Sequence, residues 1–164
     1  MTIGVLSDTH DDKNYIQKAL YIFEKSRPEL LVFCGDATTP SSLEWFCEYR
    51  IIYTYGNGDF LTGEIQALLK AHNPLNYAGF VYEGELSGKM VGVTHGHLED
   101  KLKEMLYSGR YDYIFSGHTH LRMDKRIGKT RVINPGSLGG LKKQSRSVAL
   151  LDIEMDQLHF EIID

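Results

Sequence analysis

The chain is 164 residues long, a length typical of one compact domain and too short for two of average size. Its composition, 42% hydrophobic and 24% charged, is close to the globular average and excludes a disordered chain, a collagen and a coiled coil. The net charge of −4 argues against a general nucleic-acid binder. We therefore expect a single globular domain over residues 1–164.

The apolar stretches of the sequence are short. Uninterrupted ones such as residues 30–34 and 148–151 are four or five residues long, far below the roughly 18 residues needed to span a bilayer. The N-terminal segment MTIGVLSDTH lacks the basic and long apolar regions of a secretory or transit peptide. Cys34 and Cys47 are the only cysteines and fit buried thiols in a reducing compartment. These features predict no membrane segment and a cytoplasmic location.

The first part of the chain alternates apolar runs with helical patterns. The runs that predict buried strands are IGVLSD, LLVFCGD, IIYTYGN, MVGVTHG and YDYIFSG. Apolar residues at helical spacing predict a helix over residues 14–26, stopped by Pro28. Further helices are predicted over residues 41–49, with Ser42 as cap, and over residues 61–71 and 98–108. Such alternation indicates a largely parallel sheet with right-handed crossovers.

The second part of the chain has the pattern of antiparallel strands. The segment YEGELSGKMVGV predicts a hairpin that turns at Ser87 and Gly88. After His120, antiparallel strands are predicted for RMDKRIGKTRVIN, SVALLDIEM and LHFEII. An α/β fold with two packed sheets and helices outside them accommodates both halves.

Polar side chains follow the predicted strands at their C-terminal ends. They are carboxylates, one amide and imidazoles, namely Asp8, His10, Asp36, Asn57, His95, His118 and His120. We expect them to converge, because ligands of such sheets bind at the edge formed by the C-terminal strand ends. Oxygen and nitrogen ligands without thiolate suit Mn²⁺, Fe or Zn²⁺ at an open catalytic site. Seven ligands fit two ions roughly 3.5 to 4 Å apart that share one carboxylate.

The order of these residues resembles the signature of the calcineurin-like metallophosphoesterases, and in particular of the small YfcE-type phosphodiesterases. The matching segments are Asp8-Thr9-His10, Gly35-Asp36, Gly56-Asn57-Gly58-Asp59, His95-Gly96-His97, Gly117-His118-Thr119-His120 and Asn134-Pro135-Gly136-Ser137. The resemblance implies a four-layer αββα sandwich of two mixed β-sheets flanked by helices. It also implies a dinuclear centre, with one metal held by Asp8, His10, Asp36 and His120 and the other by Asp36, Asn57, His95 and His118.

One position departs from the family pattern. Larger members of the superfamily have a histidine, thought to protonate the leaving group, where this chain has Gly58. Help of that kind is typically worth about 10²- to 10⁴-fold in rate. His97 is the remaining candidate catalytic residue, either as the acid or in contact with the phosphoryl oxygens; the alternative is a supporting or capping role. Asp59, without its usual histidine partner, receives no catalytic role.

The resemblance and the ligand set together predict a metal-dependent phosphoric diester hydrolase. We expect two divalent metal ions, Mn²⁺ before Ni²⁺, Fe²⁺, Zn²⁺ or Mg²⁺, with a bridging hydroxide attacking a small phosphodiester substrate in line. Preferred substrates should have leaving groups that need little protonation, such as aryl diesters. Relatives imply a homo-oligomer, either a dimer or a tetramer.

Two alternatives to this function stay open. Residues 122–146 hold eight of the 18 basic residues and a single acid, Asp124. The segment is either a solvated hairpin and loop or a positive surface that attracts phosphate-bearing substrates, the one support for a nuclease or cyclic-nucleotide phosphodiesterase. The other alternative is a non-catalytic protein-binding scaffold of the same fold, which the complete set of seven ligand positions disfavours. His72 and His159 lie outside all motifs and are expected to be structural or surface residues.

Overall fold

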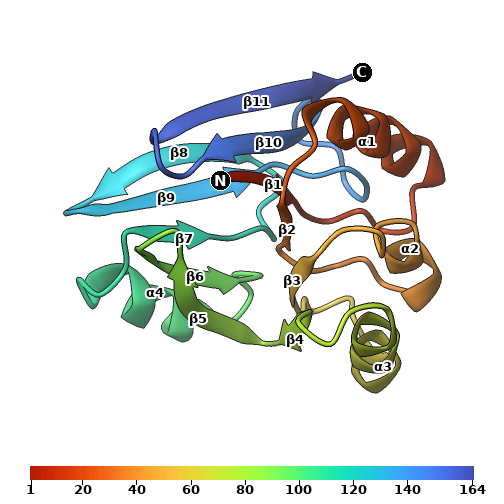
Figure 1. The fold of residues 1–164 in the computed structure, drawn as a ribbon, viewed down its shortest axis with the longest axis horizontal. Helices are drawn as coiled ribbons and strands as arrows, with labels where there is room; N and C mark the ends of the chain where they lie inside the picture. The colour runs from red at the N-terminus through yellow and green to blue at the C-terminus, as the bar shows by residue number, and fades with distance from the viewer.

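The computed structural model describes residues 1–164 and contains two mixed β-sheets packed face to face (Figure 1). The first sheet has six strands in the order β11-β10-β1-β2-β3-β4. Their bounds are β1 (Thr2–Leu6), β2 (Leu30–Phe33), β3 (Ile51–Thr54), β4 (Tyr77–Gly79), β10 (Arg146–Asp152) and β11 (Gln157–Ile163). Strands β1 to β4 are parallel, whereas β10 runs antiparallel to both β1 and β11.

The second sheet has five strands in the order β5-β6-β7-β9-β8. They are β5 (Val81–Leu86), β6 (Lys89–Thr94), β7 (Tyr113–Phe115), β8 (Arg122–Ile127) and β9 (Thr130–Pro135). The three central strands are parallel, and the two edge strands pair with them antiparallel through the predicted hairpins. The short β4 was not predicted, because three residues are too few to show a period.

Helices cover the outer faces of both sheets (Figure 1). On the first sheet lie α1 (Lys13–Ser26), α2 (Pro40–Glu44) and α3 (Thr62–His72), and on the second lies α4 (Glu99–Tyr107). The predicted four-layer αββα fold is therefore confirmed. No helix of the structure has both the length and the apolar character needed to cross a bilayer.

Helix α2 is shorter than predicted, and its cap is a different residue. Thr39, not Ser42, precedes its first turn. Beyond Glu44 the chain continues in turns whose hydrogen bonds join residues three apart, such as Phe46 N–H to the carbonyl of Leu43 at 3.0 Å. The apolar spacing of the sequence did not reveal that the α-helix ends at Glu44, because turns of this kind and an α-helix bury similar positions.

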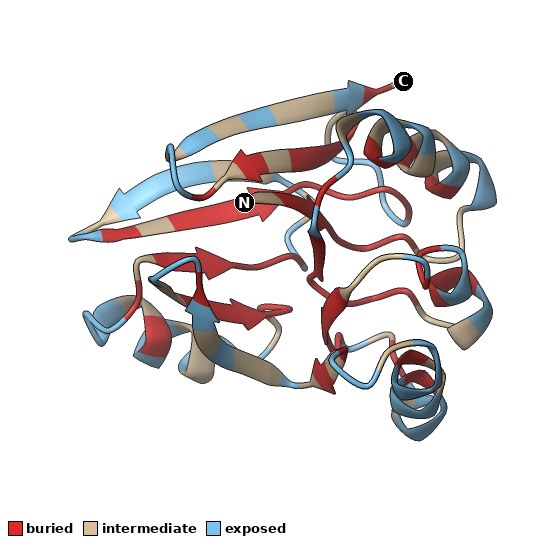
Figure 2. Ribbon diagram, viewed as in Figure 1, coloured by how far each residue is buried: buried red, intermediate tan, exposed pale blue.

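The central strands of the first sheet are buried on both faces, as the red ribbons of Figure 2 show. Val5 and Val32 pack in the core between the sheets, whereas their neighbours Leu6 and Phe33 pack in the core beneath the helices. A strand covered on both sides needs apolar residues at every position. This double burial explains the unbroken apolar runs that end just before the polar clusters.

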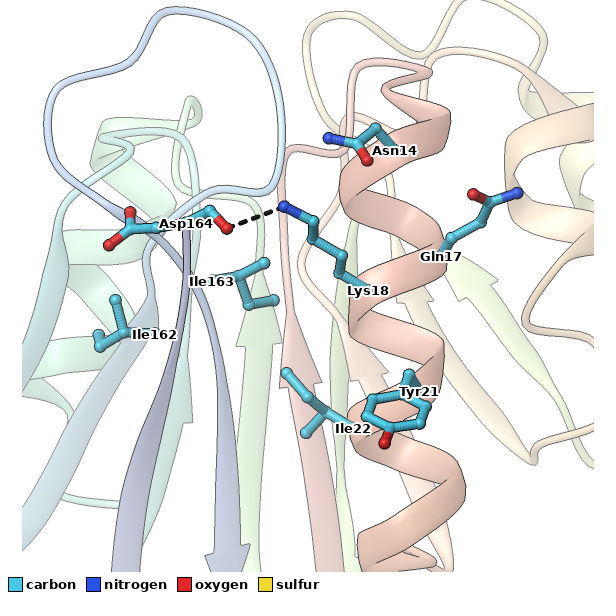
Figure 3. Close-up of a pocket in the computed structure, with 8 residues that line it drawn as sticks. All are labelled: Asn14, Gln17, Lys18, Tyr21, Ile22, Ile162, Ile163 and Asp164. Atoms are coloured by element: carbon cyan, nitrogen blue, oxygen red, sulfur yellow. Dashed lines mark hydrogen bonds between the residues drawn. The ribbon is translucent and has the colours of Figure 1, made fainter.

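A shallow cavity of about 400 Å³ lies between α1 and the end of β11 (Figure 3). Lys18 spans it, because its Nζ donates a hydrogen bond to the backbone carbonyl of Asp164 at 2.8 Å. None of the predicted site residues lines this cavity. The hydrogen bond of Lys18 ties Asp164 to α1. The cavity is separate from the predicted site residues.

Candidate metal centre

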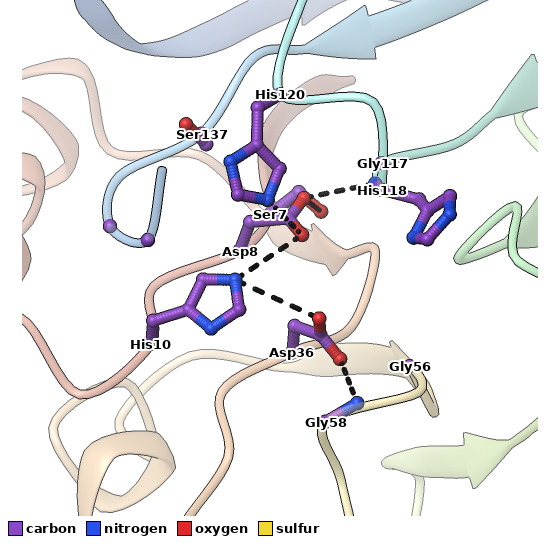
Figure 4. Close-up of polar contacts among 12 residues, drawn as sticks. Ser7, Asp8, His10, Asp36, Gly56, Gly58, Gly117, His118, His120 and Ser137 are labelled. Carbon is purple, nitrogen blue, oxygen red and sulfur yellow. Dashed lines mark hydrogen bonds and ion pairs between the residues drawn. The ribbon is translucent and has the colours of Figure 1, made fainter. Parts of the chain in front are cut away.

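The loops after β1, β2, β6 and β7 bring five of the predicted residues together, and Figure 4 shows four of them, Asp8, His10, Asp36 and His120. Two groups place their ligand atoms within 4.8 Å of one another, namely Asp8 with His10 and His120, and Asp8 with Asp36 and His95. Strands β1 and β2 of the first sheet deliver the two carboxylates, and the second sheet delivers His95 and His120. His72 and His159 are exposed and belong to neither group.

Asp8 is the carboxylate that faces the most imidazoles. Its Oδ1 lies 3.2 Å from Nε2 of His120, 3.7 Å from Nε2 of His10 and 3.9 Å from Nε2 of His95. Its Oδ2 accepts hydrogen bonds from the hydroxyl of Ser7 at 2.5 Å and from the backbone N–H of His118 at 3.0 Å. Oδ2 is thus satisfied by the chain, and Oδ1 is left directed at the histidines.

The electrostatics of Asp8 favour the ionised carboxylate. Burial by itself would raise its pKa, but the imidazoles of His10 and His120, the charge of His95 and the hydroxyl of Ser7 together hold the pKa well below its usual range. The same contact with Asp8 raises the pKa of His120, against the effect of its partial burial. Asp8 therefore favours a negative charge in a fully buried position.

Asp36 occupies the facing side of the centre. Its Oδ2 lies 3.5 Å from Nε2 of His95 and 3.7 Å from Nε2 of His10. Its Oδ1 accepts a hydrogen bond from the backbone N–H of Gly58 at 2.7 Å. Asp36 and Asp8 are each held by one oxygen, so both point the other oxygen at a shared pair of imidazoles.

Backbone carbonyls fix the orientation of two of the imidazoles. Nδ1 of His95 lies 2.6 Å from the carbonyl of Cys34, and Nδ1 of His120 lies 2.8 Å from the carbonyl of Leu141. Because a carbonyl can only accept, Nδ1 carries a proton in both rings, so the atom that gives up its proton to bind a metal is Nε2. Metal-binding histidines are held in this way by an outer acceptor.

Several buried polar atoms of the centre have no hydrogen-bond partner in the chain. They include Oδ1 of Asp8 and Nε2 of His10, and such orphaned atoms are rare in native proteins. The amide Oδ1 of Asn57 lies 3.2 Å from Nε2 of His95, so that two acceptors face each other. Cations bound among these atoms would satisfy them. The donor set therefore fits divalent metal ions of the kind that take mixed oxygen and nitrogen ligands.

His118 and His97 lie on the side of the centre near His95. The ring of His118 is 5.1 Å from that of His95, and the ring of His97 is 5.4 Å from it. Burial, followed by the charges of neighbouring histidines, lowers the pKa of both His97 and His118. Nδ1 of His97 is buried without a partner. The structure places both rings beside His95 of the second group.

The backbone at the candidate ligands is strained. The φ angles are 53° at Asp8, 43° at His10, 57° at Asp36, 66° at His118 and 60° at His120. Non-glycine residues rarely adopt positive φ, and each instance costs on the order of 1 kcal/mol or more. Such strain clusters at functional sites, where the surrounding structure holds side chains in required directions.

Asp59 has a structural role that the sequence analysis did not find. Its Oδ2 accepts from the N–H of Asp36 at 3.0 Å, the N–H of Gly56 at 2.7 Å and the hydroxyl of Tyr53 at 2.7 Å. Its Oδ1 accepts from the N–H of Thr38 at 2.9 Å. This carboxylate joins the loop that carries Asp36 to the loop that carries Asn57. The available signal was an acid in a glycine-rich turn directly after a strand.

Most basic side chains of residues 122–146 are engaged within the chain. Arg131 forms ion pairs with two aspartates, and Arg146 is almost completely buried. Only Lys125 and Lys142 make no side-chain hydrogen bond or ion pair. Several charges of the segment are thus paired within the chain, which weakens the sequence support for an extended phosphate-attracting surface, although five of the eight basic residues are exposed, namely Lys125, Arg126, Lys129, Lys142 and Lys143.

The fold and the site together define a class of protein. Residues 1–156 match the calcineurin-like phosphoesterase superfamily domain, and the chain belongs to this superfamily. It is 34% identical over 156 residues to phosphodiesterase MJ0936 of Methanocaldococcus jannaschii, an alignment that covers 94% of each chain. The resemblance seen in the sequence motifs is confirmed.

Solved structures agree with this assignment. An archaeal phosphodiesterase superposes with a TM-score of 0.94 at 32% identity, covering 99% of this chain and all of the other. The YfcE phosphoesterase from E. coli superposes with a TM-score of 0.73 at 21% identity, covering 100% of both chains. At that lower identity the second likeness concerns the fold alone.

Proposed function

We propose that the chain is a metal-dependent hydrolase of small phosphodiesters. The observation that carries this proposal is the meeting of the Asp8 and Asp36 carboxylates with the Nε2 atoms of His10, His95 and His120. The similarity to phosphodiesterase MJ0936 supports the diester as the substrate class. A nuclease has less support, because the basic segment is its one sequence feature and several charges of that segment are paired with acids of the chain.

The chemistry that two divalent cations would supply here is activation of a water molecule and neutralisation of charge on the phosphoryl oxygens. Asp8, His10, Asp36 and His120 would hold the first cation, and Asp36, Asn57, His95 and His118 the second. The carbonyls of Cys34 and Leu141 keep the Nε2 atoms of His95 and His120 available as ligands. His97, beside these rings, would contact the phosphoryl oxygens or protonate the leaving group.

The leaving-group preference follows from Gly58. This residue has no side chain to donate a proton, and its N–H is used by Oδ1 of Asp36. Without an acid at this position, esters whose leaving groups depart as stable anions should react fastest. We therefore expect aryl phosphodiesters to be preferred over alkyl phosphomonoesters.

A matrix of metals and substrates tests the proposal. The purified protein is stripped of metal, loaded with Mn²⁺, Ni²⁺, Fe²⁺, Zn²⁺ or Mg²⁺, and assayed on aryl diesters, alkyl monoesters, cyclic nucleotides and oligonucleotides. We expect aryl diesters to be turned over fastest, with Mn²⁺ as the best metal. Equal rates for aryl diesters and alkyl monoesters would contradict the leaving-group argument. No turnover in any combination would favour the scaffold alternative.

Substitution of the residues that would hold the second cation tests which residues act. Asn57→Ala and His95→Ala should each lower metal-dependent hydrolysis at least about 100-fold, because each removes a ligand. His118→Ala is the gentler companion variant, since this residue is exposed. His72→Ala is the matched control, because it removes an exposed histidine outside the centre. Circular dichroism must show that each variant folds like the unsubstituted protein. Activity close to that of the unsubstituted protein in all three ligand variants would contradict the assignment of these residues as metal ligands.

A further inference from the structure

Arg146 is a buried cation without an acidic partner. It begins β10, is 5% exposed and makes no ion pair with any carboxylate. Removing a guanidinium from water is unfavourable unless other groups replace the hydrogen bonds that it made to water. The stability of a buried guanidinium depends on acceptors for its donors; in Arg146 the two Nη atoms have them and Nε does not.

The acceptors of Arg146 all belong to the loop between β9 and β10. Nη1 donates to the hydroxyl of Ser137 at 2.8 Å and to the carbonyl of Gly139 at 2.5 Å, and Nη2 donates to the carbonyl of Gly140 at 2.7 Å. The guanidinium also lies 5.6 Å from the ring centre of Tyr15. One side chain thus determines the path of the loop at three of its residues.

This loop contacts the residues of the candidate metal centre. The N–H of Gly139 donates to the carbonyl of Asp8 at 2.6 Å, and the carbonyl of Leu141 accepts from Nδ1 of His120. A Cβ atom at Gly140 would lie 2.6 Å from Cδ2 of His10 and 2.8 Å from Cε1 of His120, so backbone and imidazoles are in direct contact.

We propose that Arg146 is a positioning residue for metal binding: it holds residues 139–141 against His10 and His120 and thereby sets their direction toward Asp8. The proposal rests on the metal centre of the proposed function. Arg146 touches neither the candidate ligands nor any reacting atom. It acts through the glycine backbone and the Leu141 carbonyl, which are outer supports of the kind whose loss weakens metal affinity about 10- to 100-fold.

Two variants and a matched control test the proposal by calorimetric titration of the metal-free protein with Mn²⁺. Arg146→Lys keeps the charge but cannot supply the guanidinium's paired donors, so one Mn²⁺ site should weaken about 10- to 100-fold. Gly140→Ala introduces a methyl group against both imidazoles and should weaken the same site. Gly128→Ala is the control, because Gly128 has φ 58° against 63° at Gly140 but no atom within 4 Å of the new Cβ.

The outcomes separate this proposal from the function on which it rests. If the unsubstituted protein binds no Mn²⁺ or other divalent cation, the proposed function fails. If it binds Mn²⁺ and folded Arg146→Lys binds equally well, Arg146 is only structural and the positioning role is wrong. Should Arg146→Lys not fold, Gly140→Ala decides the matter, since equal affinity in Gly140→Ala and Gly128→Ala would overturn the proposal. Nitrogen NMR of the histidine rings should also show His120 losing its fixed Nδ1 proton in Arg146→Lys.

Discussion

Asp59 shows how one carboxylate can order two loops that carry candidate ligands. Each of its oxygens accepts from groups of the loop after β2, and Oδ2 accepts in addition from the loop after β3 and from Tyr53. Carboxylates that accept several backbone N–H groups are strong local organisers, because such charge-assisted hydrogen bonds exceed neutral ones in strength. The direction of Asp36 toward the histidines therefore depends on a residue that touches none of them.

Replacement of this carboxylate by an amide should weaken metal binding. Asp59→Asn keeps the size but turns an NH₂ group toward N–H donors, leaving buried groups unsatisfied. We expect Mn²⁺ affinity to fall about 10- to 100-fold and the free energy of unfolding to fall by about 1 to 3 kcal/mol. Calorimetry and urea unfolding measure the two effects. Tyr53→Phe removes one of the four hydrogen bonds to Asp59 together with the hydroxyl that accepts from the N–H of Ala37, so it should lower Mn²⁺ affinity less than Asp59→Asn does. Unchanged Mn²⁺ affinity in Asp59→Asn would refute the organising role.

The candidate ligands could be predicted at the level of residues, whereas their supports could not. Asp8 and His10 stand two positions apart in the sequence at the end of a strand, and this local pattern is visible without a structure. Asp59 and Arg146 act through backbone groups far away in the sequence or across a loop, such as the N–H of Asp36. Hydrogen bonds to backbone leave no residue-type signal at the accepting or donating position.

Among the elements, the hairpin of β8 and β9 is fastened to the turn between β10 and β11. Arg126 and Arg131 lie directly opposite each other in the hairpin and repel. Asp156, in the turn, forms ion pairs with both of them, at 2.6 Å for Arg131. The turn belongs to the first sheet and the hairpin to the second, so this contact joins the two sheets away from the metal centre.

Asp156→Asn tests this fastening through its dependence on pH. Partial burial acts to raise the pKa of Asp156, but Tyr113 and Arg131 lower it overall. A carboxylate whose pKa is lowered in the folded state stabilises the folded protein at pH values above its unfolded-state pKa of about 3.9. This contribution to stability is lost as the pH falls through the pKa of the folded state. At pH 7 the variant should be less stable by about 1 kcal/mol at most, because the side chain is 39% exposed and screened.

Urea unfolding at pH 7 and near pH 2.5 provides the measurement. The stability difference between Asp156→Asn and the unsubstituted protein should shrink at the lower pH, where the aspartate is itself increasingly protonated. A difference that stays constant across this range would mean that the charge of Asp156 does not contribute. Asparagine tolerates the positive φ of 54° at this position, so backbone strain does not confuse the comparison.

Three of the four helices could be predicted to within one residue at each end, because their apolar faces have a clear period over two turns or more. Helix α1, for example, was expected over residues 14–26 and spans Lys13–Ser26. Helix α2 has five residues, too few for a period to separate it from the turns that follow. The hairpins were predictable from their turn residues, but which sheet each hairpin joins was not. That choice is made by packing between strands distant in sequence.

In the whole molecule, the candidate metal centre lies between the two sheets. Asp8, His10 and Asp36 come from loops of the first sheet, and His95 and His120 come from loops of the second. A cation held by both sets would cross-link the sheets. Binding only to the folded state stabilises a protein in proportion to the logarithm of ligand concentration.

Thermal unfolding with and without metal measures this cross-link. Mn²⁺ at about 100 times its dissociation constant should stabilise the protein by about 2.7 kcal/mol and raise the melting temperature accordingly. The rise should disappear on chelation and be strongly reduced in His120→Ala. His159→Ala should keep it, since His159 is exposed and lies on β11. An equal rise in both variants would show that Mn²⁺ binds elsewhere.

The positive φ angles at the candidate ligands set a conflict between folding and function. At such angles glycine is free of the steric cost that aspartate and histidine carry, so ligand-to-glycine changes at exposed positions such as His118 should relax the metal-free backbone. Laboratory evolution that selects only for thermostability, in the presence of a chelator, should therefore enrich glycine at His118 and its strained neighbours. The residues that such a selection discards first would be those that the chemistry needs most.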